Sequence, residues 1–102
     1  MSEIVIVAAA RTAQGRLQGA LASFSAPQLG SFAIEGALDR GGIDAAAVDA
    51  VIMGQVLPAG SGQNPARQAA LGAGIGWGTP AHSVNKVCLS GQIGRASCRE
   101  RV

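Results

Sequence analysis

The residue best suited to covalent chemistry in this 102-residue sequence is Cys88. It follows a strand-like segment, residues 81–87, and precedes Ser90 and Gly91, and small residues after a strand favour a tight turn into a helix. A thiol at such a junction points toward unpaired backbone N–H groups, whose partial positive charge favours the nucleophilic thiolate. The same N–H groups can stabilise negative charge on a thioester carbonyl oxygen during acyl transfer. Taken alone, however, a cysteine in this setting is more often a small buried hydrophobe without chemistry.

His82 is the only histidine, so it is the first candidate for a base that activates the thiol. Six residues of extended chain span about 20 Å at roughly 3.3 Å per residue. That separation is too long for a hydrogen bond to Cys88 unless the chain folds back. We therefore interpret His82 as a structural or surface residue. Strand alternation leaves open whether Lys86 contacts the thiol.

Other patterns in the sequence point to no separate ligand site. The glycines of residues 72–78 lack Gly-x-Gly-x-x-Gly spacing and follow a predicted helix, so we expect no dinucleotide site there. Gln63 and Arg67 are interpreted as loop and subunit-contact residues, because their spacing builds no definite anion clamp. Cys88 and Cys98 are ten residues apart, which is neither a metal cluster nor a Cys-x-x-Cys redox pair.

The segments that position Cys88 alternate between strands and helices, which predicts the α/β class with parallel strands joined by right-handed connections. The first helix is expected to begin at the capping-box spacing of Ser25 and Gln28 and to stop at Gly41-Gly42. Asn64 is predicted to cap a second, short helix with proline at its first position. The expected elements are strands at residues 4–7, 50–53 and 81–87, helices at 26–40 and 66–71, and a helical turn at 44–49.

Composition and charge argue against a membrane-spanning protein and against a nucleic-acid-binding protein. With 48% hydrophobic residues the chain is globular, and no apolar run is long enough to cross a membrane. Acidic and basic residues balance through Gly91, so the net charge of +2 belongs entirely to the last eleven residues. No basic stripe interleaved with aromatic residues remains, which argues against nucleic acid. Glu3 precedes the first apolar run where a targeting segment would carry basic residues, so we expect a cytoplasmic protein.

Four stretches of the sequence carry recognisable motifs. They are residues 4–12, which include Ala10-Arg11-Thr12; residues 54–58, Gly-Gln-Val-Leu-Pro; residues 62–70, Gly-Gln-Asn-Pro-Ala-Arg-Gln-Ala-Ala; and residues 85–91, Asn-Lys-Val-Cys-Leu-Ser-Gly. Together these stretches resemble the thiolase family. The resemblance implies a layered α/β/α/β/α fold of two similar halves, of which residues 1–91 supply part of the N-terminal one. It also makes an inert Cys88 improbable.

The resemblance further implies that Cys88 is the catalytic nucleophile, carrying the acyl group as a thioester. A second acetyl-CoA then attacks that thioester to give acetoacetyl-CoA, or the reaction runs in reverse as thiolysis; a thiolase for longer 3-ketoacyl-CoA is the alternative. The two bases of the family, a histidine and a second cysteine, come from downstream motifs that this chain does not reach, so we expect the fragment itself to be inactive.

Coenzyme A thioesters are the substrates that the resemblance implies. It implies no cofactor or metal, and no residue here is assigned to coenzyme A binding. The family also implies a homodimer or homotetramer whose interface includes the cysteine-bearing strand.

Residues 92–102 depart from this pattern. An apolar helix of small residues is expected after Gly91, but the chain reads Gln-Ile-Gly-Arg-Ala-Ser-Cys-Arg-Glu-Arg-Val. This string resembles the conceptual translation of a sequencing adapter. We therefore expect residues 92–102 to be a non-native, disordered tail, and we assign no function to its residues Arg95, Cys98, Arg99 and Arg101.

Overall fold

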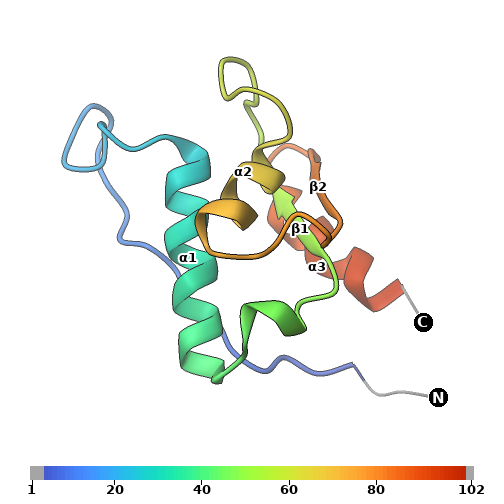
Figure 1. Cartoon of the computed structure of the whole chain (residues 1–102). Coiled ribbons are helices and arrows are strands. Elements are labelled where there is room, and N and C mark those ends of the chain that lie inside the picture. Colours follow the sequence, from blue (N-terminus) through green and yellow to red (C-terminus); the bar gives the residue numbers. More distant parts are fainter. Residues whose placement is uncertain (1–3, 101–102) are drawn as a thin grey trace.

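The computed structural model describes residues 4–100 of the chain, and their side chains as far as Arg95. Its elements, in order, are α1 (Ala26–Gly41), the 3-10 helix η1 (Ala45–Ala47), β1 (Val51–Gly54), α2 (Pro65–Gly72), β2 (Ala81–Val84) and α3 (Ser90–Glu100). Figure 1 shows α1 and α2 side by side, with the two strands next to α2. The mixture of helices and parallel strands confirms the predicted α/β class.

Helix α1 begins and ends where its sequence signals predict. The Ser25 side chain accepts a hydrogen bond from the Gln28 backbone N–H, and the Gln28 side chain accepts one from the Ser25 N–H. This reciprocal capping box satisfies two backbone donors that the first turn would otherwise leave open. At the other end Gly42 has φ +62°, the left-handed conformation that glycine adopts without a steric penalty.

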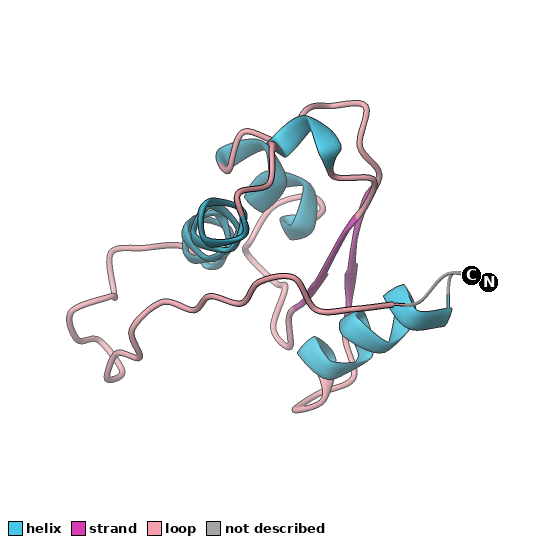
Figure 2. Cartoon of the chain, turned by 90° about the horizontal axis from the view of Figure 1, so that it is seen from below, coloured by secondary structure: helices cyan, strands magenta, loops and turns pink. Residues whose placement is uncertain are grey.

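The two strands form a parallel pair in the register Val51 to Ala81 through Gly54 to Val84. Helix α2 connects them, as parallel strands require. Figure 2 shows the layers: α1 and α2 lie on one side of the strands and α3 lies on the other. Because both strands run in the same direction, the loop after β1 and the turn after β2 leave the sheet at the same edge.

Small residues bring α1 and α2 close together, as the alanine-rich and glycine-rich composition predicts. Ser31 Oγ lies 2.9 Å from both the Pro27 and the Ala69 carbonyl oxygens, so one buried hydroxyl bridges the two helices. Ala66, Ala69 and Ala70 of α2 are almost completely buried. The core then continues to the strands through Val51, Ala70 and Ile75, with partly buried Ile34, Leu38, Val48 and Met53 packed against them.

The predicted strand at residues 4–7 is wrong for the described chain. Residues 4–16 have no regular secondary structure, and the side chains of residues 4–7 are exposed. The segment is held by α1 instead: Arg40 Nη1 donates to the Ala9 carbonyl oxygen at 3.1 Å. A β-branched run forms a strand only beside another strand that completes its hydrogen bonds. Within residues 4–100 the segment has no such neighbour.

The structure also differs from the disorder that we expected after residue 91. Helix α3 continues to Glu100, and the expected disorder is therefore wrong for residues 92–100, whereas residues 101 and 102 lie outside the described chain. The backbone of α3 lies against the sheet at Gly94, which is buried and where an added Cβ would come within 3.3 Å of Ile52. Whether these residues belong to the native protein stays a prediction.

Candidate functional site

Cys88 lies in the turn of residues 85–89, which joins β2 to α3 at the edge of the sheet where β1 also ends. Its thiol is free and exposed. Strand β2 ends at Val84, three residues earlier than predicted, because the chain turns at Asn85. The thiol therefore lies two residues before the first residue of an 11-residue helix, the strand-to-helix position that the sequence predicts. The positive end of a helix dipole favours negative charge at such a position.

Two polar side chains hold this turn. Asn85 Oδ1 accepts from the Val87 N–H at 3.0 Å, and Ser90 Oγ lies 2.7 Å from the Val87 carbonyl oxygen, to which it donates. Ser90 Oγ also accepts from the Lys86 N–H at 2.9 Å. Val87 between them has φ +49°, a left-handed conformation that is rare for a β-branched residue. Both backbone groups of the residue before Cys88 are thus fixed by side chains.

The backbone N–H groups of the turn are less open than the sequence suggests. The Leu89 N–H donates to the Lys86 carbonyl oxygen at 3.0 Å, and the Ser90 N–H donates to the Val87 carbonyl oxygen at 3.2 Å. These two donors stabilise the turn itself, so they are not free to receive the negative charge of a reacting carbonyl. The positive end of the α3 dipole still favours an anion near Cys88.

Gly54 lets α3 approach the end of β1. A Cβ at this position would lie 2.6 Å from the Gly91 nitrogen and 2.7 Å from the Ser90 carbonyl oxygen, closer than real Cβ contacts allow. The obstacles are backbone atoms, which cannot rotate away. Only glycine therefore permits the first turn of α3, and with it the Cys88 turn, to lie against the sheet.

The loop of residues 55–63 lies beside this turn and is tied to it. Asn85 Nδ2 donates to the Val56 carbonyl oxygen at 2.9 Å. Within the loop, Gln55 Nε2 donates to Ser61 Oγ at 2.9 Å, and Gln68 Nε2 of α2 donates to the Ser61 and Gln63 carbonyl oxygens. The stretches 54–58, 62–70 and 85–91, which are separate in sequence, therefore form one hydrogen-bonded unit around the Cys88 turn.

The N-terminus of α2 is fixed to β2. Asn64 caps the helix by accepting from the Arg67 N–H, and its Nδ2 donates to the Ala81 carbonyl oxygen at 3.0 Å. The Ala66 N–H donates to Ser83 Oγ at 3.1 Å. Asn64 itself has φ +43°, a conformation that asparagine tolerates better than most residues.

The remaining candidate residues have other surroundings. Arg67 lies over the Trp77 ring, 5.9 Å from its centroid, and its Nη1 is 3.5 Å from the Gly76 carbonyl oxygen. His82 is exposed on β2, in register with Ile52. Neither residue takes part in the hydrogen bonds that hold the described Cys88 turn, and their interpretation as non-catalytic residues stays a prediction.

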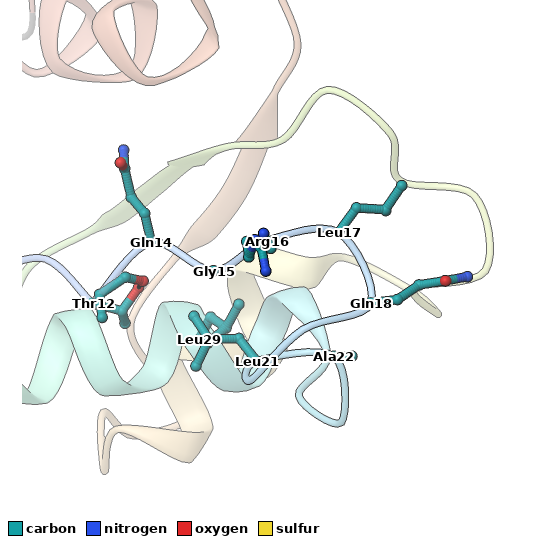
Figure 3. A pocket seen from close by; sticks show the side chains of 10 residues that line it. Thr12, Gln14, Gly15, Arg16, Leu17, Gln18, Leu21, Ala22 and Leu29 are labelled. Atoms are coloured by element: carbon teal, nitrogen blue, oxygen red, sulfur yellow. Dashed lines mark hydrogen bonds between the residues drawn. The ribbon is translucent and has the colours of Figure 1, made fainter.

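An open hollow lies where residues 12–22 cross the start of α1, and Figure 3 shows Leu21 and Leu29 close together in it while Leu17 and Gln18 point outward. Cys88 does not line it. Among the side chains described, those of residues 4–95, no three His, Cys, Asp or Glu groups converge to hold a metal ion. Within residues 4–100 no helix is both long enough and apolar enough to cross a membrane.

Sequence reasoning missed the hydrogen bonds that Asn85 and Ser90 make within the turn and the close approach of α3 to Gly54. The signal was present, because these residues lie within the stretches that carry the family resemblance. Their individual tasks follow only from the hydrogen bonds and the close approach of α3.

The fold and site together define a parallel α/β unit that presents an exposed thiol on a constrained turn before a helix. Comparison with known proteins agrees. The thiolase N-terminal domain profile matches residues 4–101. The chain is 59% identical over 91 residues to a probable acetyl-CoA acetyltransferase of Mycobacterium tuberculosis and, over the same length, 59% identical to an acetyl-CoA acetyltransferase of Pseudomonas aeruginosa. It is 53% identical over 91 residues to the mitochondrial acetyl-CoA acetyltransferase of Danio rerio.

This chain belongs to the thiolase family. The matched segments cover 89% of this chain in each of the three comparisons, but only 22 to 23% of the length of those relatives. The chain therefore spans less than a quarter of the proteins it matches.

Proposed function

We propose that the complete protein is a thiolase of the acetyl-CoA C-acetyltransferase type and that Cys88 is its acyl-accepting nucleophile. The observation that carries the proposal is the exposed Cys88 thiol, fixed two residues before α3 within the Asn-x-x-Cys-x-Ser-Gly stretch. The names of the similar proteins support acetyl-CoA as the substrate. The hydrogen-bonded turn supports the role of the thiol, since covalent catalysis needs a nucleophile held in a fixed direction.

In the first half-reaction, the Cys88 thiolate attacks the carbonyl carbon of acetyl-CoA. A bond forms between Cys88 Sγ and this carbon, the bond to the coenzyme A sulfur breaks, and coenzyme A leaves with a proton. The thiol proton of Cys88 must first pass to a base. The α3 dipole stabilises negative charge near the sulfur during this step.

In the second half-reaction, a base removes an α-proton from a second acetyl-CoA. The resulting carbanion attacks the acetyl carbonyl carbon on Cys88, a carbon–carbon bond forms, and the bond to Sγ breaks to release acetoacetyl-CoA. Thiolysis is the same sequence in reverse. Two proton-transfer groups are needed, and we propose that both come from residues beyond this chain, as the family resemblance implies. We therefore propose that the 102-residue chain alone is inactive, and measurable turnover by it would contradict this.

We further propose that the complete protein is a cytoplasmic homodimer or homotetramer. Its substrates are coenzyme A thioesters, and it needs no cofactor or metal. A thiolase for longer 3-ketoacyl-CoA would use the same Cys88 chemistry. Comparison of kcat/KM for acetoacetyl-CoA with longer 3-ketoacyl-CoA substrates separates the two, and a preference for the longer chains would reject the acetyl-CoA assignment.

The proposal is tested by replacing the nucleophile. In the complete protein, Cys88→Ser and Cys88→Ala are expected to remove thiolysis of acetoacetyl-CoA, because a hydroxyl ionises far less readily than a thiol and a methyl group is not a nucleophile. His82→Ala is the control, since it removes an exposed side chain of β2 that is interpreted as non-catalytic and should leave thiolysis unchanged. Full thiolysis by Cys88→Ala would reject the proposal.

A further inference from the structure

We infer that Asn85 and Ser90 are positioning residues for Cys88, because together they hold Val87 in the left-handed conformation that aims the thiol. The inference rests on the proposed role of Cys88 as acyl acceptor. Besides the nucleophile, the site then contains two side chains that fix the direction of the Cys88 thiol.

The first step of the argument is the backbone of Val87. Its φ of +49° is unfavourable for any residue with a Cβ and more so for a β-branched one. Such a conformation persists only where the surroundings determine it. The Val87 side chain does not supply the restraint, because it is 65% exposed.

The restraint comes from hydrogen bonds to both sides of Val87. Asn85 Oδ1 accepts from its N–H at 3.0 Å, while Ser90 Oγ and the Ser90 N–H donate to its carbonyl oxygen at 2.7 and 3.2 Å. Ser90 is only 4% exposed, so water is poorly placed to replace its hydroxyl. Asn85 is itself anchored through Nδ2 to the Val56 carbonyl oxygen.

The consequence for Cys88 follows from the planarity of the peptide group. With the Val87 carbonyl fixed, the plane of the following peptide is fixed, and so is the Cα of Cys88 from which the thiol projects. Without the two side chains, Val87 relaxes to negative φ and the thiol moves relative to α3. A displacement of about 1 Å at a reacting group can lower its rate by about 100-fold.

The experiment measures the rate of Cys88 acetylation by acetyl-CoA in the complete protein, read by peptide-resolved mass spectrometry, together with kcat and KM. Asn85→Ala and Ser90→Ala are each expected to lower the acetylation rate by about 10- to 100-fold. Val87→Gly alone is expected to change the rate by only a few-fold, because glycine adopts positive φ without a penalty. Introduced into Asn85→Ala, Val87→Gly is expected to restore most of the lost rate.

The rescue separates positioning from general stability, since removing the exposed Val87 side chain strengthens no packing. Ser90→Thr keeps the hydroxyl and should retain more activity than Ser90→Ala. Ser25→Ala is the matched control: it also removes a side-chain acceptor of a backbone N–H, at the distant start of α1, and should leave acetylation unchanged.

Each outcome is decisive. An unchanged acetylation rate in Asn85→Ala, or a loss that Val87→Gly does not reduce, overturns the inference while leaving the role of Cys88 intact. If Asn85→Ala is insoluble, recovery of soluble, acetylated protein by Val87→Gly supports the inference and failure to recover it contradicts it. Absence of acetylation in the unsubstituted protein rejects the proposed function itself.

Discussion

Substitution of Gly54 by alanine should displace the whole Cys88 turn. The added methyl group would lie 2.6 Å from the Gly91 nitrogen and closer still to the Ser90 carbonyl carbon. Ordinary van der Waals contact begins at 3.4 Å, so α3 must retreat by at least about 0.8 Å. Overpacking of this kind destabilises by about 1 to 3 kcal/mol. Alanine would otherwise stabilise the chain slightly by restricting its unfolded state, which makes a net loss diagnostic of the contact.

The displacement also predicts a loss of activity. A shift of 0.8 Å approaches the roughly 1 Å misplacement that can lower a rate by about 100-fold, so we expect Gly54→Ala to slow Cys88 acetylation by about 10- to 100-fold. Urea unfolding and acetylation kinetics of the complete protein measure the two effects. Gly76→Ala is the matched control, because no atom lies within 4 Å of a Cβ there and its φ is not positive. If Gly54→Ala were as stable and as active as Gly76→Ala, the close approach of α3 to β1 would be refuted.

Three further substitutions test the ends and the packing of helices α1 and α2. Ser25→Ala should raise amide hydrogen exchange in the first turn of α1 and destabilise it by about 1 kcal/mol, whereas Ser25→Asp, which keeps an acceptor, should not. Gly72→Ala should lower the urea midpoint by an overpacking penalty of about 1 to 3 kcal/mol, because the new methyl group meets the Ser31 hydroxyl. Gly72→Ala should therefore cost less in a Ser31→Ala background, which lacks that hydroxyl, than in the unsubstituted protein. Asn64→Gly keeps the left-handed conformation but loses the cap and the bond to β2. It should destabilise α2 by about 1 kcal/mol, a few tenths from the cap and the rest from the lost hydrogen bond; equal exchange protection of α2 in both proteins would contradict the assigned bonds.

Local signals in the sequence predicted most of the helix boundaries. Ser25 with Gln28, Asn64 with Pro65, and Gly42 act within one turn of their own helix, so their effect is visible without knowledge of the rest of the molecule. The strand-to-helix position of Cys88 was predicted for the same reason. The actual turn differs in detail, because β2 already ends at Val84 and Asn85 begins the turn.

Features that depend on distant partners could not be predicted. The apolar run at residues 4–7 has the pattern of a buried strand, but a pattern carries no information about a neighbouring strand. Gly54 reads as a strand terminator, and only the structure shows that the backbone of α3 occupies the space of its missing side chain. Likewise the positive φ of Val87 has no signal in its own residue type, since valine disfavours it.

The acyl-enzyme is the central claim, and its direct observation is the strongest test. Complete protein incubated with acetyl-CoA alone, quenched in acid and digested, should yield the peptide containing Cys88 with one acetyl group attached through a thioester that hydroxylamine removes. A peptide that stays unmodified in a preparation with full condensation activity would contradict the claim.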